Sequence, residues 1–134
     1  MFAAMLFSIS IVALTQFALY YWRAVLAGVA AQPVSERVLA AARVENGRLT
    51  SKHFPTLAGL HDLTPNLYRH RGGLGLVRVY HRFVEVLDTL AGAKLPALAA
   101  WSDRERLICA RYAAVLVDQR LQANLELVAS LRSC

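Results

Sequence analysis

Residues 1–22 carry no charged side chain, and their apolar positions follow one another almost without a break. About twenty apolar residues at a rise of 1.5 Å each match a hydrocarbon core of roughly 30 Å. A helix satisfies its own backbone polar groups, so it is the form that such a stretch takes in lipid. The apolar character continues to Ala31. We therefore expect a first helix that spans a membrane, runs past its face and stops near Gln32 and Pro33.

Beyond this stretch the apolar positions recur with the period of a helix. A second helix is predicted over residues 33–44 and is expected to end at Asn46 and Gly47, because glycine readily adopts a left-handed conformation. Residues 48–73 are rich in turn formers, so we expect an irregular segment with a short helix at 56–63 and another after Pro65.

A further helix is predicted over residues 74–90, where the 3.6-residue period is continuous. One stripe along it consists of Leu76, Val79, Phe83, Val86 and Leu90. An adjacent stripe consists of Val77, Tyr80, Val84 and Leu87. Together the two stripes cover a broad apolar face, which we expect to be mostly buried.

The last helix is predicted over residues 103–132, about 45 Å long, preceded by a short helical piece at 96–100. Ser102 and Glu105 have the spacing of a capping box that would open this helix. A heptad-like seam follows it, made of Leu107, Ala110, Ala114, Val117, Leu121, Asn124, Val128 and Leu131. The predicted fold class is all-α, with a membrane-spanning segment and its extension at 1–31 and one small basic domain at 32–134.

Charge is confined to the part of the chain after Trp22, which carries all 15 Lys and Arg and all 9 Asp and Glu, a net charge of +6. Arg23, Arg37 and Arg43 follow the apolar stretch closely, whereas no charge precedes it. By the positive-inside rule we expect the N-terminus outside and residues 32–134 in the cytoplasm, at the inner membrane.

The end of the apolar stretch has the residues of a membrane interface. Tyr20, Tyr21, Trp22 and Arg23 follow one another there, and aromatic rings beside a cation are typical of the head-group level. A cleaved signal peptide is the alternative, because Val29, Ala30 and Ala31 could form a small-residue cleavage site. Against it, no basic residue precedes the apolar run, which is long for a signal peptide.

Polar side chains inside the apolar stretch indicate a helix partner in the membrane. Gln16, with Thr15 beside it and Ser8 two turns away, offers hydrogen-bonding groups that lipid would leave unsatisfied. We expect these residues to contact other membrane-protein subunits.

The segment between Asp62 and Glu85 is basic and contains no acidic residue. Its arginines can hold a phosphate-bearing head group or an acidic partner. These arginines are Arg69, Arg71, Arg78 and Arg82. No nucleic-acid-binding motif accompanies this charge, so we expect no nucleic acid partner.

Histidine placement leaves a second hypothesis open, a cofactor- or metal-bearing subunit. His81 and Glu85 lie at i, i+4, and the irregular segment holds His53, His61 and His70. None of these spacings matches a zinc signature, and no cysteine motif accompanies them, so we expect no bound metal or cofactor. Cys109 and Cys134 are expected to be free thiols in a reducing compartment.

No catalytic motif occurs along the chain. The function that the sequence favours is a single-pass, membrane-anchored, non-catalytic subunit or scaffold of a membrane protein complex. The alternatives are the cofactor-bearing subunit that uses His81, Glu85 and the loop histidines, and an exported helical protein without residues 1–31.

Overall fold

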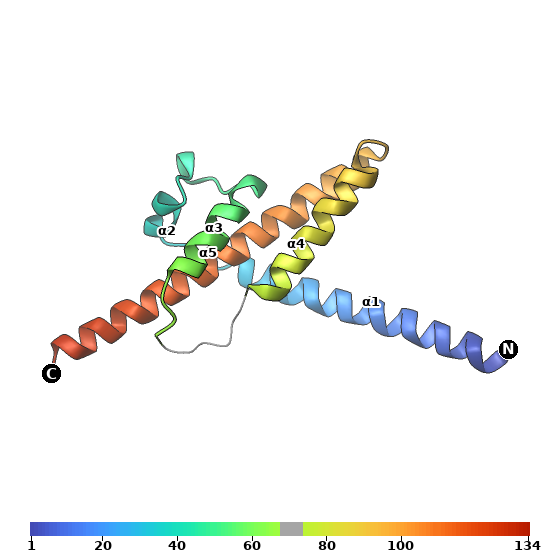
Figure 1. Cartoon of the computed structure of the whole chain (residues 1–134), viewed down its shortest axis with the longest axis horizontal. Helices are drawn as coiled ribbons and strands as arrows, with labels where there is room; N and C mark the ends of the chain where they lie inside the picture. Colours follow the sequence, from blue (N-terminus) through green and yellow to red (C-terminus); the bar gives the residue numbers. More distant parts are fainter. Residues whose placement is uncertain (68–73) are drawn as a thin grey trace.

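The computed structural model describes residues 1–67 and 74–134, and these residues form five α-helices and no β-strand (Figure 1). The helices are α1 (Phe2–Ala30), α2 (Glu36–Ala41), α3 (Phe54–Leu63), α4 (Gly75–Leu87) and α5 (Pro96–Arg132). The predicted all-α class, with a long apolar helix at the start and a long helix at the end, is confirmed. Three residues of the predicted basic segment, Arg69, His70 and Arg71, lie outside the described residues.

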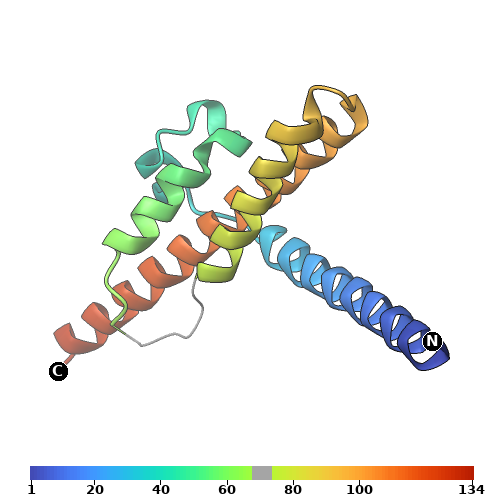
Figure 2. The ribbon, with the colours of Figure 1, turned by 45° about the vertical axis from the view of Figure 1, so that its right-hand side comes forward.

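Helix α5 is the axis of the structure, and α1, α3 and α4 all pack against it (Figures 1 and 2). It has 37 residues and a length of about 55 Å. Small residues make the close approach of its neighbours possible, because Ala110, Ala113 and Ala114 are fully buried at its middle. The predicted seam is therefore buried only near its centre. Val128 and Leu131 near the C-terminus are exposed.

The predicted start of α5 was wrong. The helix begins at Pro96, in the N-terminal position that suits proline, and continues through Ser102 without a break. The Ser102 hydroxyl donates to Oδ1 of Asp88 at 2.8 Å, and Glu105 contacts residues of two other helices. Ser102 and Glu105 therefore do not form the predicted capping box, because both side chains bind residues that are distant in the sequence.

Helix α2 is shorter than predicted, because it ends at Ala41 and not near Val44. Arg43 has a φ of 55°, and the N–H groups of Arg43 and Val44 donate to the carbonyls of Ala40 and Leu39. This is a Schellman ending with arginine in the position that glycine usually takes. Single 3₁₀ turns at Glu45–Gly47 and Ser51–His53 (η1 and η2) then lead to α3.

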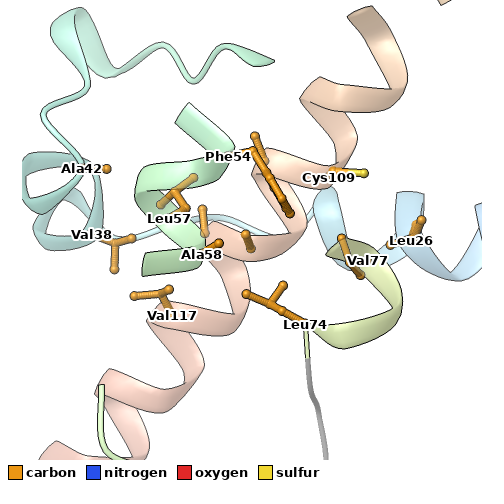
Figure 3. Packing of buried hydrophobic residues seen from close by; sticks show 13 residues of the cluster. Leu26, Val38, Ala42, Phe54, Leu57, Ala58, Leu74, Val77, Cys109 and Val117 are labelled. Carbon is orange, nitrogen blue, oxygen red and sulfur yellow. The ribbon is translucent and has the colours of Figure 1, made fainter. Parts of the chain in front are cut away.

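The core joins all five helices around the middle of α5 (Figure 3). Phe54, Leu57 and Ala58 of α3 lie on one side of it, and Leu74 and Val77 at the start of α4 lie on another. The remaining members come from α1, α2 and α5, and they are Leu26, Val38, Ala42, Cys109, Ala110, Ala113, Ala114 and Val117. The last turns of α1 therefore belong to the core of the helical domain.

Helix α4 confirms the predicted helix over 74–90 and continues into a π-helical turn at Asp88–Gly92 (η3). Its predicted burial was wrong for one of the two stripes. The stripe that includes Val77 and Val84 faces α5, whereas the five residues of the other stripe are 48–73% exposed. A period of 3.6 finds the apolar faces of a helix but does not say which of them meets the core.

Candidate functional site

The junction between α1 and the helical domain is the most highly organised polar site in the described residues. Residues 2–21 of α1 are exposed along their whole length, whereas Leu26 and Ala30 are buried in the core. By length and composition, α1 is the one described helix that is long and apolar enough to cross a membrane. Trp22 is the first residue of α1 that is partly buried, and Leu26 is the first that is fully buried.

A buried carboxylate lies at the centre of this junction. Glu105 of α5 has a side chain that is only 2% exposed, and it accepts hydrogen bonds from two other helices. Arg23 of α1 donates to Oε1 at 2.5 Å, and the Tyr80 hydroxyl of α4 donates to Oε2 at 2.7 Å. Both oxygens of the carboxylate are thus satisfied, which is the condition for burying a charge in a protein interior.

Tyr80 connects this carboxylate to the aromatic end of α1. Its ring meets Trp22 edge to face, with ring centroids 6.5 Å apart. The pKa of the Tyr80 hydroxyl is raised above its usual value, mainly because the hydroxyl is buried and secondly because it donates a hydrogen bond to the charged Glu105. The hydroxyl therefore remains a hydrogen-bond donor at any physiological pH, and α1, α4 and α5 are joined through one set of side chains.

The four residues expected at the membrane interface divide into two pairs at the junction. Tyr20 and Tyr21 are exposed on the free part of α1. Trp22 and Arg23 instead contact Tyr80 and Glu105. The aromatic end of the apolar stretch therefore lies directly against the domain, with no linker between them.

The polar residues expected to meet a partner helix lie on the free part of α1. The Ser8 and Thr15 hydroxyls donate to the carbonyls of Ala4 and Ile11 one turn earlier, each at 2.8 Å. The Gln16 amide makes no hydrogen bond to any of the described residues. Of the three predicted side chains, Gln16 is thus the one whose hydrogen-bond donors remain available.

The two described arginines of the predicted head-group site both have acidic partners. Arg78 donates to Oδ2 of Asp62 at 2.5 Å and to the carbonyl of Ala58 at 3.1 Å, which joins α4 to α3. The hydrogen bond from Arg78 to Asp62 is the main reason that the pKa of Asp62 is lowered. Arg82 forms a 3.0 Å ion pair with Glu85 on its own helix, and its side chain is 80% exposed.

His81 is buried and does not pair with Glu85 as the i, i+4 spacing suggested. Its ring stacks on Phe54 of α3, with centroids 4.1 Å apart, and Nε2 has no hydrogen-bond partner in the described residues. Burial is the main reason that its pKa is lowered. Glu85 points instead to Arg82. His81 is therefore neutral at neutral pH and acts as a core aromatic ring.

Among the described residues, the loop histidines do not lie together in one site. His53 accepts a hydrogen bond from the Thr50 backbone at the start of α3, whereas His61 is buried on α3 with a pKa lowered mainly by burial. His70 lies outside the described residues. Within residues 1–67 and 74–134, no group of three His, Cys, Asp or Glu side chains could hold a metal ion.

A second polar cluster was not predicted. Asp88, at the end of α4, accepts from the Ser102 hydroxyl and forms a 3.2 Å ion pair with Arg106, both on α5. Glu105 lies beside Trp101, Ile108 and Cys109 on a largely apolar face of α5, and this pattern was the signal that could have indicated the first cluster. No such signal marks the second cluster, because Glu85 and Asp103 lie one turn before Asp88 and Arg106.

The chain matches no protein-family model, no curated protein and no solved structure. Its functional interpretation therefore depends on the junction itself.

Proposed function

We propose that the chain is a single-pass, membrane-anchored, non-catalytic subunit or scaffold whose helical domain lies directly on the membrane face. The observation that carries this proposal is the division of α1. Residues 2–21 are apolar and exposed, and the following turns are built into the core through Leu26 and the Arg23–Glu105 pair. An exposed apolar helix of this length is stable in lipid and not in water.

The junction argues against the exported protein with a cleaved signal peptide. Cleavage after Ala31 would remove Leu26 and Ala30 from the core and Arg23 from Glu105. A buried carboxylate without its cation is strongly destabilising. A domain whose core includes the last turns of α1 is therefore suited to keep this helix as an anchor.

The proposed orientation has residues 32–134 in the cytoplasm, because Arg23, Arg37 and Arg43 follow the apolar helix. The two cysteines supply a test. Cys134 is exposed at the end of α5, whereas Cys109 is buried with a pKa raised to about 12, mainly by burial. A membrane-impermeant maleimide should therefore react with the folded protein at Cys134 alone.

In spheroplasts that produce the protein, we expect no maleimide labelling before lysis and labelling after it. Cys134→Ser is the matched control and should abolish the signal in both samples. Labelling of intact spheroplasts would reverse the orientation. Recovery of the labelled protein in the carbonate-soluble fraction would contradict the anchor itself.

The subunit role predicts a partner for the face of α1 that carries Gln16. Replacing Gln16 by Leu should leave membrane insertion intact and reduce the recovery of partner subunits after purification in mild detergent. Phe17→Leu, an apolar exchange at the next position, is the control. Equal recovery from the two variants would remove Gln16 from the proposed contact, and recovery of the native chain without any partner would count against the subunit role.

A further inference from the structure

Helix α4 and the π-helical turn η3 that continues it present a row of large apolar side chains that no described residue covers. Leu76, Val79, Phe83, Val86 and Leu90 are 70%, 69%, 57%, 48% and 73% exposed. Their spacings alternate between three and four residues, so the four that lie on α4 fall within an arc of about 80° of the helix, and Leu90 continues the row into η3. A continuous exposed apolar row of this kind marks a contact with another molecule or with a membrane. We call these five residues the outer stripe.

The contacts of α4 determine which way the outer stripe faces. Arg78 reaches Asp62 on α3, and Val77 and Val84 are buried towards α5. Continuing round the helix in the same direction, the next residue is Tyr80, which contacts Trp22 of α1. The outer stripe begins beyond Tyr80, after the partly buried Leu87. It therefore lies on the α1 side of α4 and faces away from α3.

The position of α4 along α1 is equally specific. Tyr80 meets α1 at Trp22, the residue at which the exposed part of α1 ends. Both views of the ribbon show α4 running across the direction of α1 and not along it (Figures 1 and 2). If α1 crosses a bilayer, α4 consequently lies near the plane where α1 leaves it.

We propose that α4 is an interfacial helix, whose outer stripe is inserted into the boundary between lipid head groups and acyl chains. This inference rests on the proposed membrane anchor. The stripe has the composition of a membrane-surface helix, with leucine, valine and phenylalanine on one face. Arg82, 80% exposed, borders the stripe at Val79 and Val86 and reaches the head-group level with its guanidinium.

A lipid surface fits this stripe better than a second copy of the chain. A partner helix on the outer stripe would have to enter between α4 and the bilayer, on the side to which α1 extends. Lipid is already present there when α1 is inserted, and it can cover all five side chains without any change in the protein. The stripe and the aromatic end of α1 then form one continuous membrane-contacting surface.

Spin labels on the full chain in nanodiscs test this placement. The labels are attached at Val79→Cys, Phe83→Cys, Leu14→Cys and Leu63→Cys, each in a Cys134→Ser background and with one copy per phosphatidylcholine–phosphatidylglycerol disc. Leu14 lies within α1 and reports the anchor. Leu63 is 82% exposed, as apolar as the stripe residues, and lies on α3, from which the stripe faces away. The buried Cys109 should stay unlabelled, which verifies the fold in each variant.

We expect the labels at 14, 79 and 83 to be more accessible to oxygen than to a water-soluble nickel chelate, and the label at 63 to show the opposite order. A lipid-exposed label at 14 with water-exposed labels at 79 and 83 would overturn the interfacial helix and keep the anchor. Water exposure at 14 would overturn both. Labels at 79 and 83 that become shielded only when two copies share a disc would assign the stripe to a second chain and overturn the lipid contact.

A charge on the stripe provides a second measurement. Val79→Glu should move a spin label at position 83 from oxygen-accessible to chelate-accessible, because a carboxylate resists entry into the acyl region. Leu63→Glu should leave the label at 83 unchanged. An identical accessibility at 83 in the two variants would contradict lipid contact by the stripe.

Discussion

The guanidinium of Arg23 lies 2.5 Å from Oε1 of Glu105, although the two residues are separated by most of the chain. Arg23 follows the apolar stretch directly, and Glu105 is buried in the longest helix. The long apolar helix is thus fixed to the domain by an ion pair close to the point where α1 changes from exposed to buried. Its orientation relative to the domain is therefore defined and does not depend on a linker.

Replacing Arg23 by Met should destabilise the domain, because Glu105 would remain buried with only Tyr80 as its partner. Loss of a fully buried partner costs about 3–5 kcal/mol. Arg23 is 50% exposed, so solvent screening reduces the expected loss of unfolding free energy to about 2 kcal/mol. The rate of maleimide labelling at Cys109 under increasing denaturant measures this loss.

The control for this variant removes the charge that Arg23 neutralises. Glu105→Gln in the Arg23→Met background should restore part of the lost stability, because a neutral amide is less costly to bury than an unpaired carboxylate. Equal stabilities of the single and the double variant would mean that the unpaired charge of Glu105 is not what destabilises Arg23→Met.

Gly92 and Gly59 should respond in opposite directions to alanine. A Cβ at Gly92 would overlap Oδ1 of Asp88, and this carboxylate is held by Ser102 at Oδ1 and by Arg106 at Oδ2. We expect Gly92→Ala to lower the unfolding free energy by about 1–3 kcal/mol. Gly59 lies within α3, and a Cβ there meets nothing within 4 Å. Gly59→Ala should therefore raise stability by roughly 0.5–1 kcal/mol, as in other exposed helix positions.

Thermal unfolding of the two glycine variants beside the native chain, in the same detergent, checks this pair. Equal stabilities of Gly92→Ala and Gly59→Ala would show that the Asp88 cluster moves away from an added methyl group as easily as an open helix surface accepts one.

His81 should make the domain less stable in acid. Burial lowers its pKa in the folded chain, with Arg106 and Arg82 lowering it further and Glu85 opposing them. Between the folded pKa and the unfolded value of about 6.5, the unfolded chain therefore binds a proton that the folded chain does not. This contribution to stability is complete above pH 6.5 and declines as the pH falls below it. His61, also with a lowered pKa, adds to the same decline.

His81→Phe keeps a flat ring on Phe54 and removes both the titration and the unsatisfied Nε2. Its unfolding free energy should depend less on pH between neutrality and the acid side of 6.5 than that of the native chain. Denaturant titrations at several pH values measure the difference. An unchanged slope would assign the acid sensitivity to other groups.

The sequence was sufficient for those features that depend on local periodicity. The long apolar helix, the helix over 74–90 and the long last helix were all predicted from it and are confirmed. Which apolar face of a helix packs against the core could not be predicted from periodicity. Val79 and Val84 belong to equally apolar stripes, yet Val79 is 69% exposed and Val84 is fully buried, because only one stripe meets α5.

The junction could not be predicted, because its residues are partners only in the folded chain. Ser102 and Glu105 have a spacing that indicates a cap, and nothing near them in the sequence reveals Asp88, Tyr80 or Arg23 as their partners. What the sequence did contain was an acidic residue on an otherwise apolar face of α5. That pattern indicates a buried charge and thus a cation elsewhere in the chain, without saying which one.

Two truncated chains separate the exposed part of α1 from the part that stabilises the domain. Residues 19–134 keep Arg23, Leu26 and Ala30, whereas residues 32–134 lose all three. Burial of a leucine side chain contributes about 1.5–3 kcal/mol, and an unpaired Glu105 costs about 2 kcal/mol more. The sum is close to the whole stability of a marginal domain, about 5 kcal/mol. We expect cooperative thermal unfolding from 19–134 and none from 32–134 in the same detergent, as followed by circular dichroism. Equal, cooperative transitions would mean that the domain folds without α1, and the argument against a cleaved signal peptide would then fall.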